Sequence, residues 1–343
     1  MHVPDGFLDA STSLATGVAA ATAVGVALRK ARDEVDERTA PLAGLTAAFV
    51  FAVQMLNFPV GVGTSGHLLG GALAAVLVGP WTAVLCVSVV LIVQALLFAD
   101  GGLTALGTNV TLIAVVTVAV GWFVTRAVLL VLPRRPASVV PASAVGALVS
   151  VPAAALVFVL LFAVGGNADL PLATLTAAML GWHVLVGIGE AVITALTVSA
   201  VVAVRPDLVY AARDVRPSLQ LKAADGQLVD APAGSATAEV SRSIRGIVIG
   251  GGAAALVLAG VVSFYASGNP DGLEYVAGEN GFLRTARDHL LGGSALADYG
   301  EVGGIPIGVA GVLGVLLIIG AGWLVFRSVS RRSRRTGTGA RSH

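Results

Sequence analysis

Long apolar stretches, separated by polar or glycine-rich breaks, make up most of this 343-residue chain. A helix needs about 20 apolar residues to cross the hydrocarbon core of a bilayer. On this pattern we predict nine spanning segments, at about 11–29, 41–59, 66–79, 81–98, 107–131, 139–165, 172–203, 244–266 and 304–326. The third is short and rich in glycine, which is typical of a broken or re-entrant element.

A polar stretch divides the apolar segments into two groups. Residues 206–243 hold prolines and glycines among scattered charges, a composition typical of a connector. We therefore expect a membrane domain over 1–205, a cytoplasmic linker over 206–243, a C-terminal membrane unit over 244–327 and a basic cytoplasmic tail over 328–343. The predicted fold is an all-α integral membrane protein, in which a seven-helix transmembrane bundle precedes a two-helix unit with an external loop.

Composition and charge agree with this class. Hydrophobic residues make up 56% of the chain and charged residues 12%, with a mean hydropathy of +0.89, whereas soluble domains carry about 25% charged residues. If the N-terminus is outside, every Lys and Arg except Arg284 and Arg287 falls on the cytoplasmic side, as the positive-inside rule requires. We therefore expect a multi-pass protein of the cell membrane with a cytoplasmic C-terminus. The basic tail suits an anionic lipid surface, and no nucleic-acid partner is expected.

The sequence lacks the motifs of several enzyme classes. Without Gly-x-x-x-x-Gly-Lys-Ser/Thr the chain should not hydrolyse ATP itself, and without His-Glu-x-x-His it should not be an intramembrane zinc protease. A Gly-x-Ser-x-Gly elbow is also missing. Cys86 is the single cysteine, which excludes an internal disulfide and a thiolate cluster. We expect neither enzymatic activity nor an organic cofactor.

The strongest chemical signal is a histidine in second position. The amine of Met1, the amide of His2 and its imidazole can close fused five- and six-membered rings around a metal ion once the amide loses its proton. Flat nitrogen coordination suits Ni²⁺, Cu²⁺ and related ions. The start lacks the basic region of a signal peptide. We therefore expect Met1 to keep a free amine, either exposed on the outer side or folded back into the membrane domain.

A second histidine lies on the same predicted side of the membrane. His67 sits in a glycine-rich break at the outer end of the second segment, and irregular backbone at membrane depth is tolerated where it lines a cavity. Its imidazole would complete a set of four nitrogens with Met1 and His2. For His67 alone, the alternative is an ordinary hydrogen-bonded histidine at the membrane interface.

Two further polar groups are candidates for supporting roles. The outward-facing break after the fourth segment carries Gln94, Asp100 and Asn109, which could orient a ligating histidine or could satisfy helix ends. In the seventh segment His183 and Glu190 lie seven residues apart, on one helix face. A metal relay or a conformational lock is the functional interpretation of this pair, and a buried hydrogen-bonded pair or network is the structural one.

These motifs resemble the CbiM/NikM family, the substrate-binding membrane components of energy-coupling factor transporters for cobalt and nickel. The resemblance covers about residues 1–205 and rests on the stretches Met1–Leu8, Gly63–Gly71, Gln94–Asn109 and Gly181–Glu190. The stretch Asn269–Ala277 is similar to the PDGLE domain, an accessory component of such transporters that occurs either separately or fused.

The resemblance implies a seven-helix core into which the N-terminal segment folds. It implies a metal held by the amine of Met1, the amide and imidazole of His2, and the imidazole of His67, with Ni²⁺ or Co²⁺ as the transported substrate. The implied partners are a transmembrane coupling subunit similar to CbiQ/NikQ and cytoplasmic ATPases similar to CbiO/NikO. The alternative is an ATP-independent secondary cation transporter or channel, with Glu190 and Asp100 on the ion path.

The external loop of the C-terminal unit, at about 267–303, is acidic. Its carboxylates, Asp271 and Glu274 among them, could attract a divalent cation or help to seat the N-terminal clamp. Solubility explains the same charges equally well.

Overall fold

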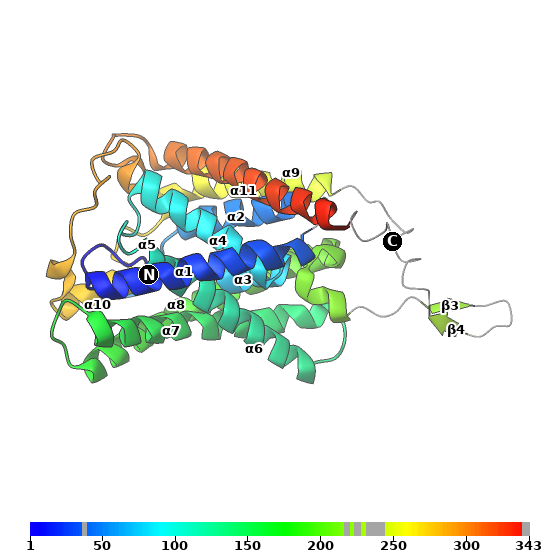
Figure 1. Ribbon diagram of the computed structural model, residues 1–343, viewed down its shortest axis with the longest axis horizontal. Helices are drawn as coiled ribbons and strands as arrows, with labels where there is room; N and C mark the ends of the chain where they lie inside the picture. Colours follow the sequence, from blue (N-terminus) through cyan, green and yellow to red (C-terminus); the bar gives the residue numbers. More distant parts are fainter. Residues whose placement is uncertain (36–39, 216–219, 223–227, 231–243, 338–343) are drawn as a thin grey trace.

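The computed structural model describes residues 1–35, 40–215, 220–222, 228–230 and 244–337, and long helices run side by side through it (Figure 1). The helices are α1 Ala10–Lys30, α2 Ala40–Gln54, α3 Gly71–Val78, α4 Pro80–Val93, α5 Leu106–Asn109, α6 Thr117–Val131, α7 Val139–Gly165, α8 Leu172–Val204, α9 Arg245–Gly260, α10 Gly272–Glu279 and α11 Ile307–Gly337. The strands are β1 Phe58–Gly61, β2 Thr64–Gly66, β3 Gln220–Lys222 and β4 Leu228–Asp230. Two π-helical turns, at Gln94–Phe98 and Val110–Val116, extend α4 and join α5 to α6.

Six helical stretches of the described chain are long and apolar enough to cross a membrane, which confirms a multi-span helical membrane protein. They are Ala10–Asp33, Pro80–Phe98, Leu106–Val131, Pro136–Gly165, Leu172–Val204 and Ile307–Val329. Of the other three predicted segments, α2 and α9 are shorter than a full span, against the prediction, whereas α3 is the short element that its length and glycines predicted. At 1.5 Å per residue, α3 rises only about 12 Å of a hydrocarbon core about 30 Å thick.

The second predicted segment ends earlier than the sequence suggested. Helix α2 stops at Gln54, and the chain continues into an antiparallel hairpin in which β1 pairs with β2 across a bulge. Pro59 carries no N–H for a helix or a regular ladder, and Gly63 at the turn has φ +72°, which favours glycine. The hairpin leads directly into the segment that carries His67.

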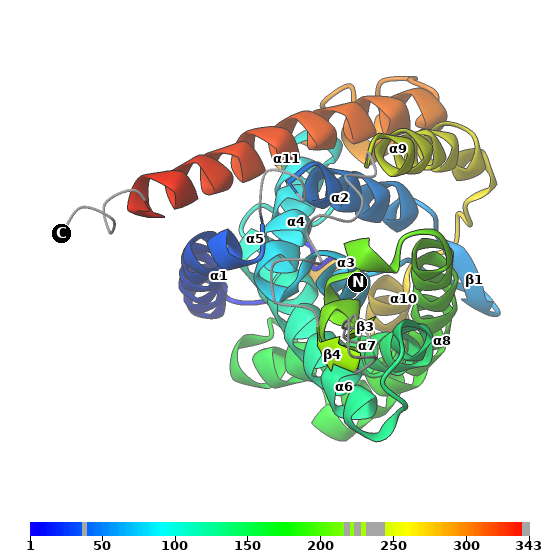
Figure 2. The same ribbon diagram turned by 90° about the vertical axis from the view of Figure 1, so that its right-hand side faces the viewer.

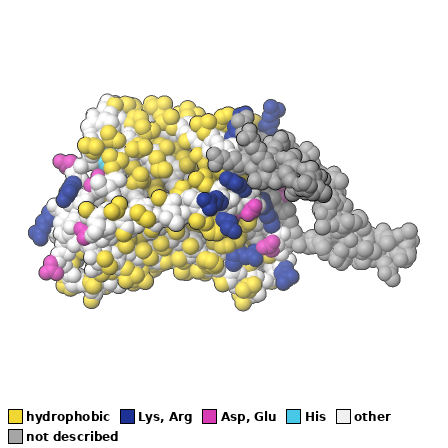
Figure 3. Space-filling view, in the orientation of Figure 1, with side chains coloured by type: hydrophobic (Ala, Val, Ile, Leu, Met, Phe, Trp, Pro, Cys, Tyr) yellow, Lys and Arg dark blue, Asp and Glu magenta, His cyan; other side chains and the backbone are white. Residues whose placement is uncertain are grey.

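The helices form two groups around a central pair. Viewed along the bundle, α2, α9 and α11 lie together on one side, α6, α7 and α8 lie on the other, and α3 and α4 lie between them (Figure 2). The surface between the two ends of the bundle is largely hydrophobic, and most of the visible Lys and Arg side chains gather at one end (Figure 3). This is the distribution that a bilayer-spanning bundle requires.

The N-terminal segment is folded into the protein, which is one of the two alternatives that the sequence left open. The side chains of Val3 and Phe7 are fully buried. Leu8 forms an isolated bridge to Gly166 at the end of α7. Asp9 then caps α1 by accepting a hydrogen bond from the Thr12 amide at 2.7 Å. The chain end therefore lies inside one end of the bundle, next to the loop between α9 and α11.

The C-terminal unit carries a helix that was not predicted. Between α9 and α11 the external loop forms α10, which packs against α8 and β2. Helix α11 runs to Gly337, so the predicted tail over 328–343 begins as a continuation of that helix, and residues 338–343 lie outside the described residues. Of the predicted linker over 206–243, residues 216–219, 223–227 and 231–243 also lie outside them.

Candidate metal centre

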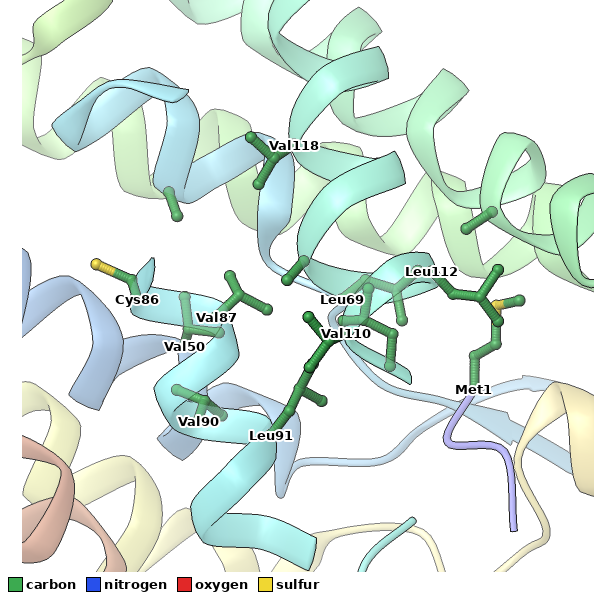
Figure 4. Packing of buried hydrophobic residues seen from close by; sticks show 14 of the residues in the cluster. Met1, Val50, Leu69, Cys86, Val87, Val90, Leu91, Val110, Leu112 and Val118 are labelled. Carbon is green, nitrogen blue, oxygen red and sulfur yellow. The ribbon is translucent and has the colours of Figure 1, made fainter. Parts of the chain in front are cut away.

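Met1 is anchored by its side chain. It is only 4% exposed, and it belongs to the same buried cluster as Leu69, Val110 and Leu112, towards which it points in Figure 4. Burying a methionine side chain contributes about 1.5–3 kcal/mol relative to leaving it in water. This anchoring directs the terminal amine towards the external loops.

The backbone that follows Met1 is fixed by two polar side chains. Asn109 accepts from the Val3 amide at 2.7 Å and donates to the Val3 carbonyl at 3.0 Å. Asp5 accepts from the amides of Leu103, Thr104 and Ala105. The segment is thus tied to the loop that follows Asp100, and the positions of both chain-end residues are set by this loop.

His67 faces the terminal amine. Its Nδ1 donates to the Leu68 carbonyl at 2.9 Å, and its Nε2 lies 2.5 Å from the Met1 amine. Because Nδ1 carries the proton, Nε2 presents a lone pair, which is the tautomer that metal-ligating histidines adopt. The ring is 5% exposed.

Glycines allow the His67 segment to pack so closely. A Cβ on Gly66 would stand 2.6 Å from a methyl group of Val186 on α8. Gly70 has φ +81° and lies against Val50, where a Cβ would stand 2.7 Å from another methyl group. Larger residues at either position would move His67 away from the chain end.

His2 stacks on His67, with ring centroids 4.9 Å apart and planes inclined by 13°. Its Nδ1 lies 3.0 Å from Oδ1 of Asp100. Its Nε2 is buried and has no hydrogen-bond partner in the described part of the chain. The fused chelate predicted from the sequence uses Nδ1, so a metal bound there would take the place of the proton through which Nδ1 contacts Asp100.

A carboxylate from the C-terminal unit completes the group. Oδ2 of Asp271 lies 2.5 Å from the Met1 amine and 3.6 Å from Nε2 of His67. Asp271 was noted in the sequence only as one of several acids of the external loop. Nothing in its spacing from Met1 or His67 could have singled it out, because they lie 270 and 204 residues away in the chain (271 − 1 and 271 − 67).

The charges around the amine shift the pKa values of its neighbours. Burial lowers the pKa of His67, and the ammonium of Met1 lowers it further. Burial by itself would raise the pKa of Asp271, but the ammonium and His67 hold it well below its ordinary value. The pKa of Asp100 is also lowered, since His2 and the Tyr299 hydroxyl outweigh the effect of burial. The ammonium group therefore lies between one neutral imidazole and the ionised carboxylate of Asp271, and the ionised carboxylate of Asp100 lies against His2.

These groups line a cavity of about 910 Å³ between the N-terminal segment and the external loop. Its walls include His2, His67, Asp100, Asp271 and Tyr299. Among the described residues, no three or more His, Cys, Asp or Glu side chains are arranged to hold a metal ion by themselves.

The remaining candidates play supporting roles in the structure. Glu190 accepts from the amides of Leu69 and Gly70, at 2.6 and 2.8 Å, and so holds the backbone just after His67. His183 does not pair with Glu190: its Nδ1 donates to the Met179 carbonyl of its own helix. Both are buried and hydrogen-bonded, as the structural interpretation predicted, but they are not bonded to each other.

Gln94 and Tyr299 form a second link to the site. Gln94 donates to the Tyr299 hydroxyl at 3.1 Å, and this hydroxyl donates to Oδ2 of Asp100 at 2.5 Å. Gln94 thus acts on His2 only through two other side chains. Tyr299 was not singled out in the sequence, because a lone tyrosine in a loop carries no signal of this kind.

The apolar helices define a multi-span membrane protein, and the buried nitrogen donors give it a polar site at one end. Comparison with known protein families identifies the family of this chain. Residues 2–208 match the CbiM family, described as a cobalt uptake substrate-specific transmembrane region, and residues 245–331 match the PDGLE domain. The chain belongs to the CbiM family of cobalt and nickel transport membrane proteins and carries a fused PDGLE domain.

Individual relatives agree with this family. A protein of Haloquadratum walsbyi assigned to metal transport is 39% identical over 210 residues, which are 61% of this chain and 94% of that protein. A protein of Archaeoglobus fulgidus assigned as a fused nickel transport protein, NikMN, is 38% identical over 209 residues, 61% of this chain and 68% of that protein. The crystal structure of a truncated transition metal transporter superposes with a TM-score of 0.54 at 33% identity, over 59% of this chain and 99% of that one.

The contact of Glu190 with the His67 segment yields a prediction. Glu190→Gln replaces one carboxylate oxygen by an NH₂ group that cannot accept from a backbone amide. Hydrogen bonds to a charged group contribute about 1.5–3 kcal/mol and neutral ones about 0.5–1.5, so amide exchange at Leu69 and Gly70 should rise about tenfold. Hydrogen-exchange mass spectrometry in detergent measures it. Ser150→Ala is the control, since Ser150 is buried but bonds only within its own helix, and equal exchange in both variants would contradict the role of Glu190.

Proposed function

We propose that this chain is the substrate-specific membrane subunit of an ATP-driven energy-coupling factor importer for Ni²⁺ or Co²⁺. It would bind the metal on the outer side in a planar nitrogen site and release it inside the cell. The observation that carries the proposal is the approach of the Met1 amine to Nε2 of His67, at 2.5 Å, beneath the stacked ring of His2. Family membership supplies the class of substrate.

The distances suit a single metal ion. Nitrogen ligands bind such metals at about 2.0 Å, so two neighbouring ligands in a square plane lie about 2.8 Å apart. The Met1 and His67 nitrogens are already close to this separation. The amide of His2 and Nδ1 of its imidazole would supply the other two corners. A planar site of four nitrogens disfavours Zn²⁺, which prefers a tetrahedron, and favours Ni²⁺ and related ions.

We infer that the site faces outward. With the N-terminus outside, nearly all Lys and Arg residues lie on the cytoplasmic side. The visible basic side chains gather mainly at the end of the bundle opposite the candidate site (Figure 3). The metal would therefore enter from the outside, through the cavity below the external loop.

The proposed partners are a coupling subunit similar to CbiQ/NikQ and ATPases similar to CbiO/NikO. Two observations favour this class over an ATP-independent transporter. The oxygens of Glu190 are taken by backbone amides, and those of Asp100 by His2 and Tyr299. Neither carboxylate is left to form an ion path. Cellular uptake that proceeds without co-expressed ATPases would favour the alternative.

His2→Ala and His67→Ala should each weaken metal binding by more than about 100-fold, because each removes a ligand, and loss of a supporting residue alone costs about 10- to 100-fold. Purified full-length protein with a free Met1 amine is titrated with Ni²⁺ or Co²⁺, and bound metal is measured by mass spectrometry. His289→Ala, in the external loop, is the matched control. Wild-type affinity in either of the first two variants would defeat the site assignment.

Adding one residue before Met1 should be equally damaging. The extension moves the terminal amine away from His67 and replaces it by an amide nitrogen, which cannot bind until it loses its proton. Bound metal per protein is compared between the extended chain and the chain with a free Met1. Equal occupancy would rule out the amine as a ligand.

Metal affinity should fall as the pH is lowered from 8 to 5. Binding would displace one proton from the amine and one from the amide, so affinity should drop by up to about 100-fold per pH unit. A free imidazole has a pKa of about 6.5. Burial lowers the pKa of His67, so its imidazole stays neutral to a lower pH than a free ring. Above pH of about 6.5, His67 therefore contributes little to the change of metal affinity with pH. The slope is measured by Ni²⁺ titration in one detergent at each pH, and a flat profile would count against nitrogen ligation.

A further inference from the structure

Two residues of the C-terminal unit reach the two residues at the chain end. Asp271, at the start of α10, contacts the Met1 amine at 2.5 Å. Tyr299, in the turn before α11, contacts Asp100, which in turn contacts His2. The two contacts come from opposite ends of the external loop, so the loop holds the chain end at two points.

The position of the Asp271 carboxylate is fixed by backbone amides at the start of α10. Its Oδ1 caps α10 by accepting from the amides of Leu273 and Glu274, at 2.8 and 2.9 Å, which leaves Oδ2 for Met1. Just before it, the Pro270 carbonyl accepts from the Ser65 amide at 2.9 Å, and the Ser65 hydroxyl donates to the Asn269 carbonyl at 2.7 Å. The strand that leads into His67 is thereby bonded to the segment that carries Asp271.

The Tyr299 hydroxyl is held just as firmly. Its ring stacks on Phe98 at 5.0 Å and lies near Phe51, and its hydroxyl accepts from Gln94. Asp298 and Tyr299 both have φ +50°, the left-handed region that non-glycine residues rarely adopt. Two consecutive residues in this conformation are maintained only where the surroundings determine it, and here the outcome is a hydroxyl directed at Asp100.

We propose that the PDGLE unit supplies two positioning residues to the metal site: Asp271, which holds the Met1 amine, and Tyr299, which through Asp100 holds the His2 ring in place before the metal binds. This inference rests on the proposed function, since the groups held are the proposed ligands. Ordering the residues at a chain end lowers their conformational entropy, which costs free energy. A site that is already ordered before binding binds more tightly, because this free energy is not lost when the metal binds. The fused unit is then part of the binding site, in addition to being linked to it.

The test uses the full chain with a free Met1 amine, and Ni²⁺ alone as the probe. Asp271→Asn and Asp271→Ser keep a side-chain oxygen for the α10 cap but remove the carboxylate, and Tyr299→Phe keeps the ring but removes the hydroxyl. The Asp271 variants should bind Ni²⁺ at least tenfold more weakly, and Tyr299→Phe about three- to tenfold. Matched controls are Asp9→Asn, which alters the cap carboxylate of α1, and Tyr275→Phe, in the same external loop. Both should bind as the wild type does.

Two readouts separate positioning from general damage. In metal-free protein, an amine-selective acylating reagent should modify Met1 at least fivefold faster in both Asp271 variants, because the amine is no longer held. The imidazole NMR signals of ¹⁵N-labelled His2 in the metal-free protein should shift in Tyr299→Phe, because the Asp100 carboxylate beside the ring is no longer held by the hydroxyl. Wild-type affinity in the Asp271 and Tyr299 variants would overturn the inference, and so would weaker binding with an unchanged acylation rate and unchanged His2 signals.

Failure of the proposed function gives a different result. If the wild type takes up no Ni²⁺, or His67→Ala retains it, the site assignment is wrong. The acylation rate is measured without metal and therefore still decides whether Asp271 holds the chain end.

Discussion

The buried ammonium group of Met1 is the constraint on which this end of the helix bundle depends. A charge removed from water is tolerated only when it is paired and hydrogen-bonded. Here the carboxylate of Asp271 and the imidazole of His67 supply both. The three groups come from the first residue, from the break between α2 and α3, and from the PDGLE unit. Pairing one charge therefore fixes the relative positions of three distant parts of the chain.

The rest of the site follows from that arrangement. With the amine in place, the His2 ring lies on His67 and turns an edge to Asp100. Asn109 and Asp5 secure the backbone behind it, while Glu190 secures the backbone behind His67. The result is a set of nitrogen donors held around one cavity. In the proposed site, metal binding would require the loss of protons but no refolding of the chain.

Much of this could be predicted from the sequence, for identifiable reasons. Hydrophobic length located the long helices, because the need to cross a bilayer leaves few alternatives. The start Met1-His2 favours chelation because its chemistry is local, and this stays a prediction. Helix α3 and the hairpin after Gln54 were harder to predict, because a glycine-rich break indicates that a helix ends but does not indicate which structure follows it. The roles of Asp271 and Tyr299 could not be predicted, because they depend on how the external loop folds over residues far away in the chain.

We propose that the chain end and His67 bind one metal ion together. X-ray absorption spectroscopy of the Ni²⁺-loaded protein, purified with a free Met1 amine, is the sharpest test. We predict a first shell of nitrogen neighbours alone, with the edge feature of a square-planar ion and the outer-shell scattering of two imidazoles. A six-coordinate shell of oxygen neighbours without imidazole scattering would contradict it.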